Sequence, residues 1–151
     1  MKPFRFPLKR VLDIRSDQEG QAQELYARAV RLMEQFNERR RQVENSLEAN
    51  LEECSRECSG PTESGRVVQL RTMLEVLREK LKAMEPEAAE LKVALDEKWQ
   101  ELVIARQKRE AMDKLQDRKK EAHEREVARE EQLGLDEMIS LRESRGSTKM
   151  M

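Results

Sequence analysis

The amino-acid sequence predicts an all-α protein, a long antiparallel two-helix coiled-coil hairpin with an overhanging second helix. Charged residues make up 40% of the 151 residues and aromatic residues only 3%, which leaves few bulky side chains for a round core. Apolar residues recur every three or four positions through most of the chain. A short segment rich in Gly, Pro and Ser interrupts this pattern once, after about residue 58. Together these observations favour two long helices that pack along a narrow apolar line, called the seam below.

The second half of the chain carries the clearer coiled-coil pattern. Alternate steps of three and four residues give fourteen positions, of which twelve are apolar. Such a repeat, held over about six heptads, is typical of a coiled-coil seam and not of a disordered chain. The predicted seam positions are Val67, Leu70, Leu74, Leu77, Leu81, Met84, Ala88, Leu91, Leu95, Lys98, Leu102, Ala105, Arg109 and Met112.

The first half repeats the pattern less regularly. Its predicted stripe shifts by about one residue after Phe36, and such a shift rewinds a supercoil locally without ending it. The positions are Leu8, Val11, Arg15, Gln18, Ala22, Leu25, Ala29, Leu32 and Phe36, followed by Val43, Leu47, Leu51, Cys54 and Cys58.

The connecting segment contains residues that end one helix and start another. Gly60 can close the first helix, Pro61 prevents its continuation, and Thr62 or Ser64 can cap the second. Two apolar stripes joined by a short connection bury each other when the helices run antiparallel. We therefore expect a single domain over residues 1–143, with helices at about 8–58 and 65–142, a turn at 59–65 and a disordered tail at 144–151.

This arrangement sets an expected register. If the turn is centred near residue 62, paired residue numbers add to about 124, so that Ala29 faces Leu95. Beyond about Arg118 the second helix should have no partner except the N-terminal segment. Pro86 removes a hydrogen bond inside the second helix and predicts a kink there.

The sequence contains no pattern that indicates catalysis, a cofactor or a metal. The net charge of −1 argues against a general nucleic-acid binder. The chain has no apolar run long enough to cross a membrane and no N-terminal apolar core of signal-peptide length, so we expect a cytosolic, non-enzymatic protein. Cys54 and Cys58 lack nearby partner ligands and are expected to pack in the seam, and His123 is expected to be solvated.

Two features exceed what a bare hairpin needs. The first is a band of apolar side chains away from the predicted seam, which predicts a docking surface, although a locally thicker seam would also explain it. The band consists of Tyr26, Val30, Met33, Val93, Trp99, Val103 and Ile104. The second is basic charge where the chain start meets residues 106–120, which hold seven basic and three acidic side chains. Like charges at that open end would be relieved by an acidic partner.

Two stretches of the sequence resemble the FliJ family of flagellar export proteins. The start, Phe4 to Arg15, fits the family pattern F-x-F-x-L-x-x-V-L-x-x-R and is followed by Glu19 and Ala22. The second stretch looks like the family's basic helix and its final E-Q-x-x-L-D-E segment. It comprises Lys98, Trp99, Leu102, Ala105, Arg106, Arg109, Leu115, Arg118 and Lys119, then Glu131, Gln132, Leu135, Asp136 and Glu137.

The resemblance implies a non-enzymatic rod that resembles the central stalk of rotary ATPases. It implies insertion into the hexameric flagellar export ATPase, contacts with the export-gate membrane protein and cargo chaperones, and a peripheral place on the cytoplasmic face of the membrane. The open-end residues expected to meet the ATPase are Phe4, Phe6, Leu8, Val11, Arg106, Arg109, Lys114, Leu115, Arg118 and Lys119. The apolar band is expected to meet the gate or chaperones, and the free protein is expected to be a monomer. The equivalent stalk of a virulence-type secretion system and a generic coiled-coil scaffold remain alternatives.

Overall fold

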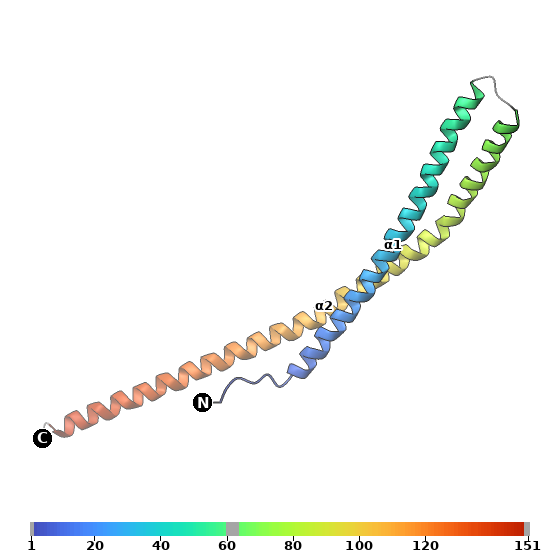
Figure 1. Ribbon diagram of the computed structural model, residues 1–151. Coiled ribbons are helices and arrows are strands. Elements are labelled where there is room, and N and C mark those ends of the chain that lie inside the picture. The colour runs from blue at the N-terminus through green and yellow to red at the C-terminus, as the bar shows by residue number, and fades with distance from the viewer. Residues whose placement is uncertain (1, 60–63, 150–151) are drawn as a thin grey trace. The chain divides into compact units, whose positions relative to one another are not determined.

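The computed structural model of the protein describes residues 2–59 and 64–149 and contains two long α-helices (Figure 1). Helix α1 spans Lys9–Cys58 and helix α2 spans Ser64–Lys149, and helices are the only regular elements in the described ranges. The two helices pack antiparallel, which confirms the predicted all-α hairpin. Their 50 and 86 residues correspond to lengths of about 75 Å and 130 Å at about 1.5 Å per residue.

Helix α2 extends farther than the sequence predicted. Residues 144–149 were expected to be a disordered tail, but α2 continues through Lys149. No proline follows Pro86, and Gly146 alone costs a helix only about 1 kcal/mol relative to Ala. Nothing local therefore ends the helix near residue 142. Residues 150 and 151 of the predicted tail lie outside the described residues.

The end of α1 is stabilised by a local serine. The Ser59 hydroxyl donates to the Ser55 carbonyl at 2.6 Å, and the Ser59 backbone N–H donates to the Arg56 carbonyl at 3.3 Å. These bonds satisfy helix-terminal carbonyls that have no partner within the helix. The roles predicted for Gly60, Pro61 and Thr62 lie outside the described residues.

The contacts of the chain group into two compact units. One, called the terminal unit, comprises Met1–Glu19 and Ala105–Met151, and the other, called the hairpin unit, comprises Gly20–Ile104. Each unit contains part of α1 and part of α2. The prediction that the chain forms a single domain stays a prediction.

The core of the hairpin unit lies around Phe36, which is wholly buried. Val43 and Met84 complete the buried cluster, and Met33, Leu77, Leu81, Ala88 and Leu91 pack against it. The guanidinium groups of Arg39 and Arg40 each lie 5.6 Å from the Phe36 ring centroid and cover its solvent side. Arg39 also forms an ion pair with Glu87 at 2.8 Å across the two helices.

The predicted register holds in both units. In the hairpin unit Tyr26 lies beside Trp99, so their residue numbers add to 125, close to the expected 124. In the terminal unit Glu19 pairs with Arg106, and these two residue numbers also add to 125. All fourteen predicted seam positions of α2 are buried or half-buried, including Leu70, Leu74 and Leu102, which are 5%, 6% and 3% exposed.

The predicted stripe of the first helix was correct at eight of its fourteen positions, which are buried or half-buried, and wrong at the other six, where the side chains are exposed. The eight are Val11, Arg15, Ala22, Ala29, Phe36, Val43, Leu47 and Cys54. Leu8, Leu25 and Leu32 are exposed, and so is Gln18. The half-buried side chains that form the observed stripe include Arg15, Glu19, Ala22, Tyr26, Ala29 and Met33. The predicted and the observed stripe share Arg15, Ala22, Ala29 and Phe36, which lie seven residues apart. At the position between each of these, the observed seam residue comes one residue later in the sequence than the predicted one. Apolarity could not choose between Leu25 and Tyr26 or between Leu32 and Met33, and the remaining seam position holds the charged Glu19.

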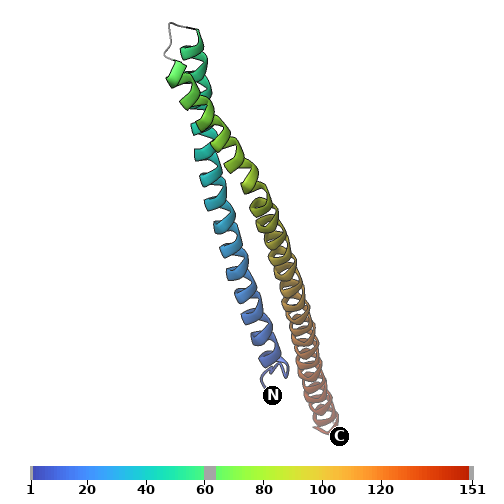
Figure 2. The same ribbon diagram turned by 90° about the vertical axis from the view of Figure 1, so that its right-hand side faces the viewer.

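Helix α2 runs without interruption through Pro86. Within the hairpin unit it changes direction along the yellow-green stretch that holds this residue, in both views (Figures 1 and 2). A proline lacks the N–H that would bond to the preceding turn, and its ring crowds that turn, so a bend at this point has a local cause.

Candidate interaction surfaces

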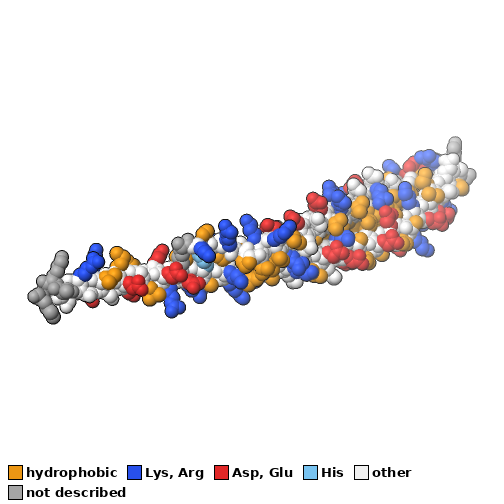
Figure 3. Space-filling view, turned by 90° about the horizontal axis from the view of Figure 1, so that it is seen from below, with side chains coloured by type: hydrophobic (Ala, Val, Ile, Leu, Met, Phe, Trp, Pro, Cys, Tyr) orange, Lys and Arg blue, Asp and Glu red, His pale blue; other side chains and the backbone are white. Residues whose placement is uncertain are grey.

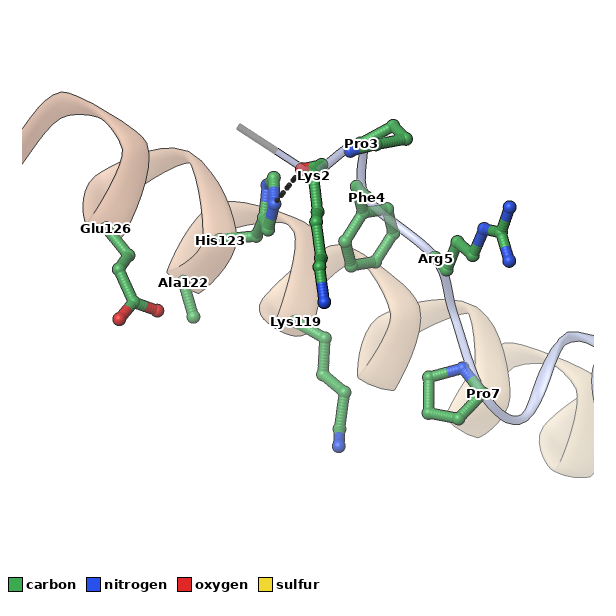
Figure 4. A pocket seen from close by; sticks show the side chains of 9 residues that line it. All are labelled: Lys2, Pro3, Phe4, Arg5, Pro7, Lys119, Ala122, His123 and Glu126. Atoms are coloured by element: carbon green, nitrogen blue, oxygen red, sulfur yellow. Dashed lines mark hydrogen bonds between the residues drawn. The ribbon is translucent and has the colours of Figure 1, made fainter. Parts of the chain in front are cut away.

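The N-terminal segment of the terminal unit packs on α2. Residues 2–8 are not helical; Phe6 is 8% exposed, and the Phe4 ring is tilted against the His123 ring at a centroid distance of 5.6 Å. The His123 Nε2 atom lies 3.1 Å from the Lys2 carbonyl oxygen (Figure 4). An open groove of about 780 Å³ runs between this segment and α2. Its lining residues are Lys2, Pro3, Phe4, Arg5, Pro7, Lys119, Ala122, His123 and Glu126.

The expectation of a solvated His123 was therefore wrong, because this side chain is half-buried and holds the N-terminal segment. The predicted register contained the signal that would have found it. A sum of about 124 places the first residues of the chain opposite His123. The prediction that the N-terminal segment is the partner of α2 beyond about Arg118 is confirmed by these contacts.

A charged cluster occupies the seam of the terminal unit. The Arg106 Nε atom lies 3.4 Å from Oε1 of Glu19, and Arg109 donates from Nε to the other oxygen of the same carboxylate. Arg109 Nη1 also donates to Asp113 Oδ2 at 2.6 Å. Hydrogen bonding from Arg109 lowers the pKa of Glu19 below its usual value, and hydrogen bonds to Glu19 and Asp113 raise the pKa of Arg109. Glu19 and Arg109 therefore both stay ionised at neutral pH.

This cluster divides the predicted ATPase-contact residues into two classes. Arg106 and Arg109 already pair with Glu19, so their charges are largely compensated inside the terminal unit. Lys114, Arg118 and Lys119 are exposed and form no ion pair within the described ranges. Of the apolar members Phe6 is buried, Phe4, Val11 and Leu115 are half-buried, and Leu8 is exposed.

Exposed basic side chains gather on the surface of the terminal unit. In Figure 3, blue Lys and Arg side chains lie around the pale blue histidine. On the N-terminal segment Lys2 and Arg5 are exposed, and on α2 Lys119 and Lys120 are exposed. The predicted meeting of the two basic segments is confirmed where Lys2, Arg5 and Lys119 line one groove. This surface is suited to an acidic partner.

The predicted docking band in the hairpin unit is partly internal. Tyr26, Val30 and Met33 are half-buried on α1, and Met33 packs against the Phe36 cluster. On α2, Val93, Trp99 and Ile104 are 57%, 46% and 51% exposed, and Val103 is half-buried. The Tyr26 and Trp99 rings contact each other at a centroid distance of 5.3 Å. The accessible part of the band is thus its α2 side.

The two cysteines lie near the end of α1 as free thiols. Cys54 is half-buried, as expected for a seam residue, and burial together with the neighbouring Cys58 raises its pKa. Cys58 is exposed, so the prediction that it packs in the seam was wrong. It is the last residue of α1.

No group of three or more His, Cys, Asp or Glu side chains within residues 2–59 and 64–149 is placed to hold a metal ion. Within those ranges neither helix is apolar enough over a sufficient length to cross a membrane.

A family model described as "Flagellar FliJ protein" matches residues 4–148 of the sequence. The match covers both helices, the N-terminal segment and the charged cluster. The chain belongs to the FliJ family. The resemblance of the chain start and of the basic part of α2 to that family is thereby confirmed.

Among solved structures, the FliJ-family chain is similar to CT670 from Chlamydia trachomatis, a proposed YscO homologue. The TM-score is 0.54 at 22% sequence identity, over 97% of this chain and 99% of CT670. This likeness supports the two-helix fold. A comparison with curated protein sequences found no significant match.

Proposed function

We propose that this FliJ-family protein is a non-enzymatic component of the flagellar type III export apparatus that inserts its terminal unit into the hexameric export ATPase. The observation that carries the proposal is the family match over residues 4–148. The protein acts from the cytoplasmic face of the membrane at the flagellar base. It stimulates ATP hydrolysis and couples the ATPase to the export gate and to cargo chaperones.

The terminal unit supplies the ATPase contact in this proposal. Two packed helices are about 20 Å wide, which suits the central hole of a hexameric ring. The exposed Lys114, Arg118 and Lys119 provide uncompensated positive charge for an acidic collar. Phe4 and Phe6 hold the N-terminal segment against α2, so they act mainly by shaping this end.

The α2 side of the apolar band supplies the second contact. Val93, Trp99 and Ile104 are large apolar side chains that remain about half exposed. Docking of the export gate or a chaperone there would remove this area from water. Because Tyr26 already supports the Trp99 ring, that ring is held in place before a partner binds.

The ATPase contact is tested by reversing the exposed charges Lys114→Glu, Arg118→Glu and Lys119→Glu together. The variant should keep its helical content in circular dichroism and lose most of its stimulation of ATP hydrolysis. The matched control reverses three exposed cations of the hairpin unit, Arg28, Arg31 and Lys82, and should stimulate normally.

Salt supplies an independent arm of the same test. Raising ionic strength from 0.1 M to 1 M shortens the Debye length from about 10 Å to about 3 Å and should mimic the charge reversal. If the charge-reversal variant stimulates the ATPase normally at low salt, the proposal of an electrostatic contact is wrong.

The band is tested by Trp99→Ala combined with Val103→Ser. Binding to the export gate or to chaperones should weaken, with the helical content nearly unchanged. The double variant Leu51→Ala with Val68→Ser, which removes exposed apolar area elsewhere in the hairpin unit, is the control. A variant whose helices unfold but which still binds its partner normally would show that the band belongs to the core and is not a docking surface.

Ultracentrifugation of the free protein at micromolar concentration should show a monomer.

A further inference from the structure

The seam changes character in the terminal unit, where charged side chains lie among the apolar ones. Glu19 keeps only 14% of its side chain exposed, whereas Glu87, in the cross-helix pair with Arg39, keeps 45%. Arg109 keeps 29% exposed. Desolvation offsets part of the attraction in such a partly shielded ion pair, and charged seam residues are best known for selecting one alignment of two helices.

The contacts of Glu19 are specific to one alignment of the helices. Both of its carboxylate oxygens are used, one by Arg106 and the other by Arg109, and Arg109 also binds Asp113. Sliding α1 by one heptad in one direction would place Glu19 opposite Trp99 and Leu102 in place of the two arginines. The carboxylate would then lie against apolar side chains.

A slip in the other direction is opposed by a different penalty. It would place Glu19 opposite Asp113 and Gln116. Two carboxylates would then share one site, where each disfavours the ionisation of the other. The cluster therefore disfavours both neighbouring alignments.

The apolar seam alone discriminates poorly between such alignments. Residues seven apart on α2 are alike in character, since Ala88, Leu95 and Leu102 are all apolar. A slip of seven residues therefore still places apolar side chains against apolar side chains. Charged or polar seam residues are the usual means by which a coiled coil selects one register.

We propose that the cluster of Glu19, Arg106, Arg109 and Asp113 determines the register in which the start of α1 pairs with α2. The register in turn sets where the N-terminal segment reaches. A slip of one heptad moves the chain by about 10 Å along the helix axis, which would take Phe4 away from His123. Glu19 is thus a positioning residue for the terminal unit, and this role does not depend on any partner.

The experiment reports the register directly through engineered disulfides in a Cys54→Ser, Cys58→Ser background. Leu12→Cys with Met112→Cys reports the native register. Leu12→Cys with Ala105→Cys, and Leu12→Cys with Lys119→Cys, report slips of one heptad in the two directions. The yield of intramolecular disulfide after mild oxidation is measured for each pair, on protein shown to be monomeric.

With the cluster intact, the native pair should dominate. In the variant Glu19→Leu with Arg109→Leu the helical content should be kept, and slipped disulfides should rise by about tenfold relative to the native one, because the penalties for slipping are gone. Removing the exposed pair, with Arg39→Gln and Glu87→Gln, should leave the disulfide pattern unchanged.

A charge swap separates register control from simple stabilisation. Glu19→Arg, Arg106→Glu, Arg109→Glu and Asp113→Arg together keep opposite charges between position 19 and positions 106 and 109 and like charges between positions 19 and 113, at the cost of the weaker contact of Arg109 with Glu110, so most of the native pattern should return. If the leucine variant forms only the native disulfide, the proposal is overturned. Because the readout involves no ATPase, its failure would leave the proposed export role untouched.

Discussion

In the hairpin unit the two helices pack around a buried apolar cluster, whereas in the terminal unit a partly shielded ion cluster lies between them and the N-terminal segment makes an aromatic contact with α2. Of the seven buried apolar side chains among the described residues, six, including Phe36, belong to the hairpin unit and Phe6 belongs to the terminal unit. The terminal unit instead has Glu19 between two arginines, and Phe4 against His123. The same pair of helices is therefore expected to respond to cavity-forming substitutions in one unit and to pH and salt in the other.

The largest effect is expected from Phe36→Ala, which empties the centre of the hairpin unit. Truncating a buried Phe costs about 3 kcal/mol or more, because apolar contact is lost and a cavity remains. Chemical denaturation followed by circular dichroism should show this loss. Leu32→Ala, at a side chain that is 54% exposed, is the control and should cost well under about 1 kcal/mol. An equal loss of unfolding free energy in the two variants would contradict the finding that Phe36 faces the seam and Leu32 faces solvent.

A second phenylalanine substitution, Phe6→Ala, is the matching test in the terminal unit. Phe6→Ala should release the N-terminal segment from α2 with little change in the global unfolding midpoint, because that segment adds few contacts to the long helices. Limited trypsin digestion should cut faster at Arg5, Lys9 and Arg10. A fall in the midpoint as large as that of Phe36→Ala would mean that both units unfold as one and that the comparison fails.

A smaller effect, with a distinct pH dependence, is expected from Glu19→Gln. Arg109 and Arg106 lower the pKa of Glu19, so its ionised form stabilises the folded state. That contribution is present above the ordinary Glu pKa of about 4.3 and is lost as pH falls through the lower folded value. Thermal unfolding should show the wild type above Glu19→Gln at pH 7 and the two converging as pH falls below about 4. A gap independent of pH would indicate that packing, and not charge, is what Glu19 supplies.

The smallest effect is expected at the exposed pair of the hairpin unit. Arg39 and Glu87 keep 58% and 45% of their side chains exposed, so their coupling should be at most about 1 kcal/mol. A double-mutant cycle with Arg39→Ala and Glu87→Ala measures it. A larger coupling energy would show that charge also contributes to the apolar hairpin unit.

Prediction from the sequence succeeded where apolar periodicity carries the information. The α2 seam is regular because nearly every position is apolar, and the position of the connection was enough to estimate the cross-helix register to within a residue or two. It failed on α1 because a charged residue occupies the seam there, and hydrophobicity cannot distinguish a buried Glu19 from a solvated one. The contact of His123 could have been derived from the register, but its charged neighbours suggested exposure.

The sequence by itself determined that this chain forms two long antiparallel helices, since a repeat of three and four residues can bury its apolar side chains only along another helix. The motifs at both ends of the chain also indicated its family. The tertiary structure decided which of two neighbouring faces of α1 turns inward, and that Arg106 and Arg109 point into the seam while Lys114, Arg118 and Lys119 remain exposed. The physical reason is that the location of a charge depends on the partner available across the seam, and that partner lies about ninety residues away along the chain.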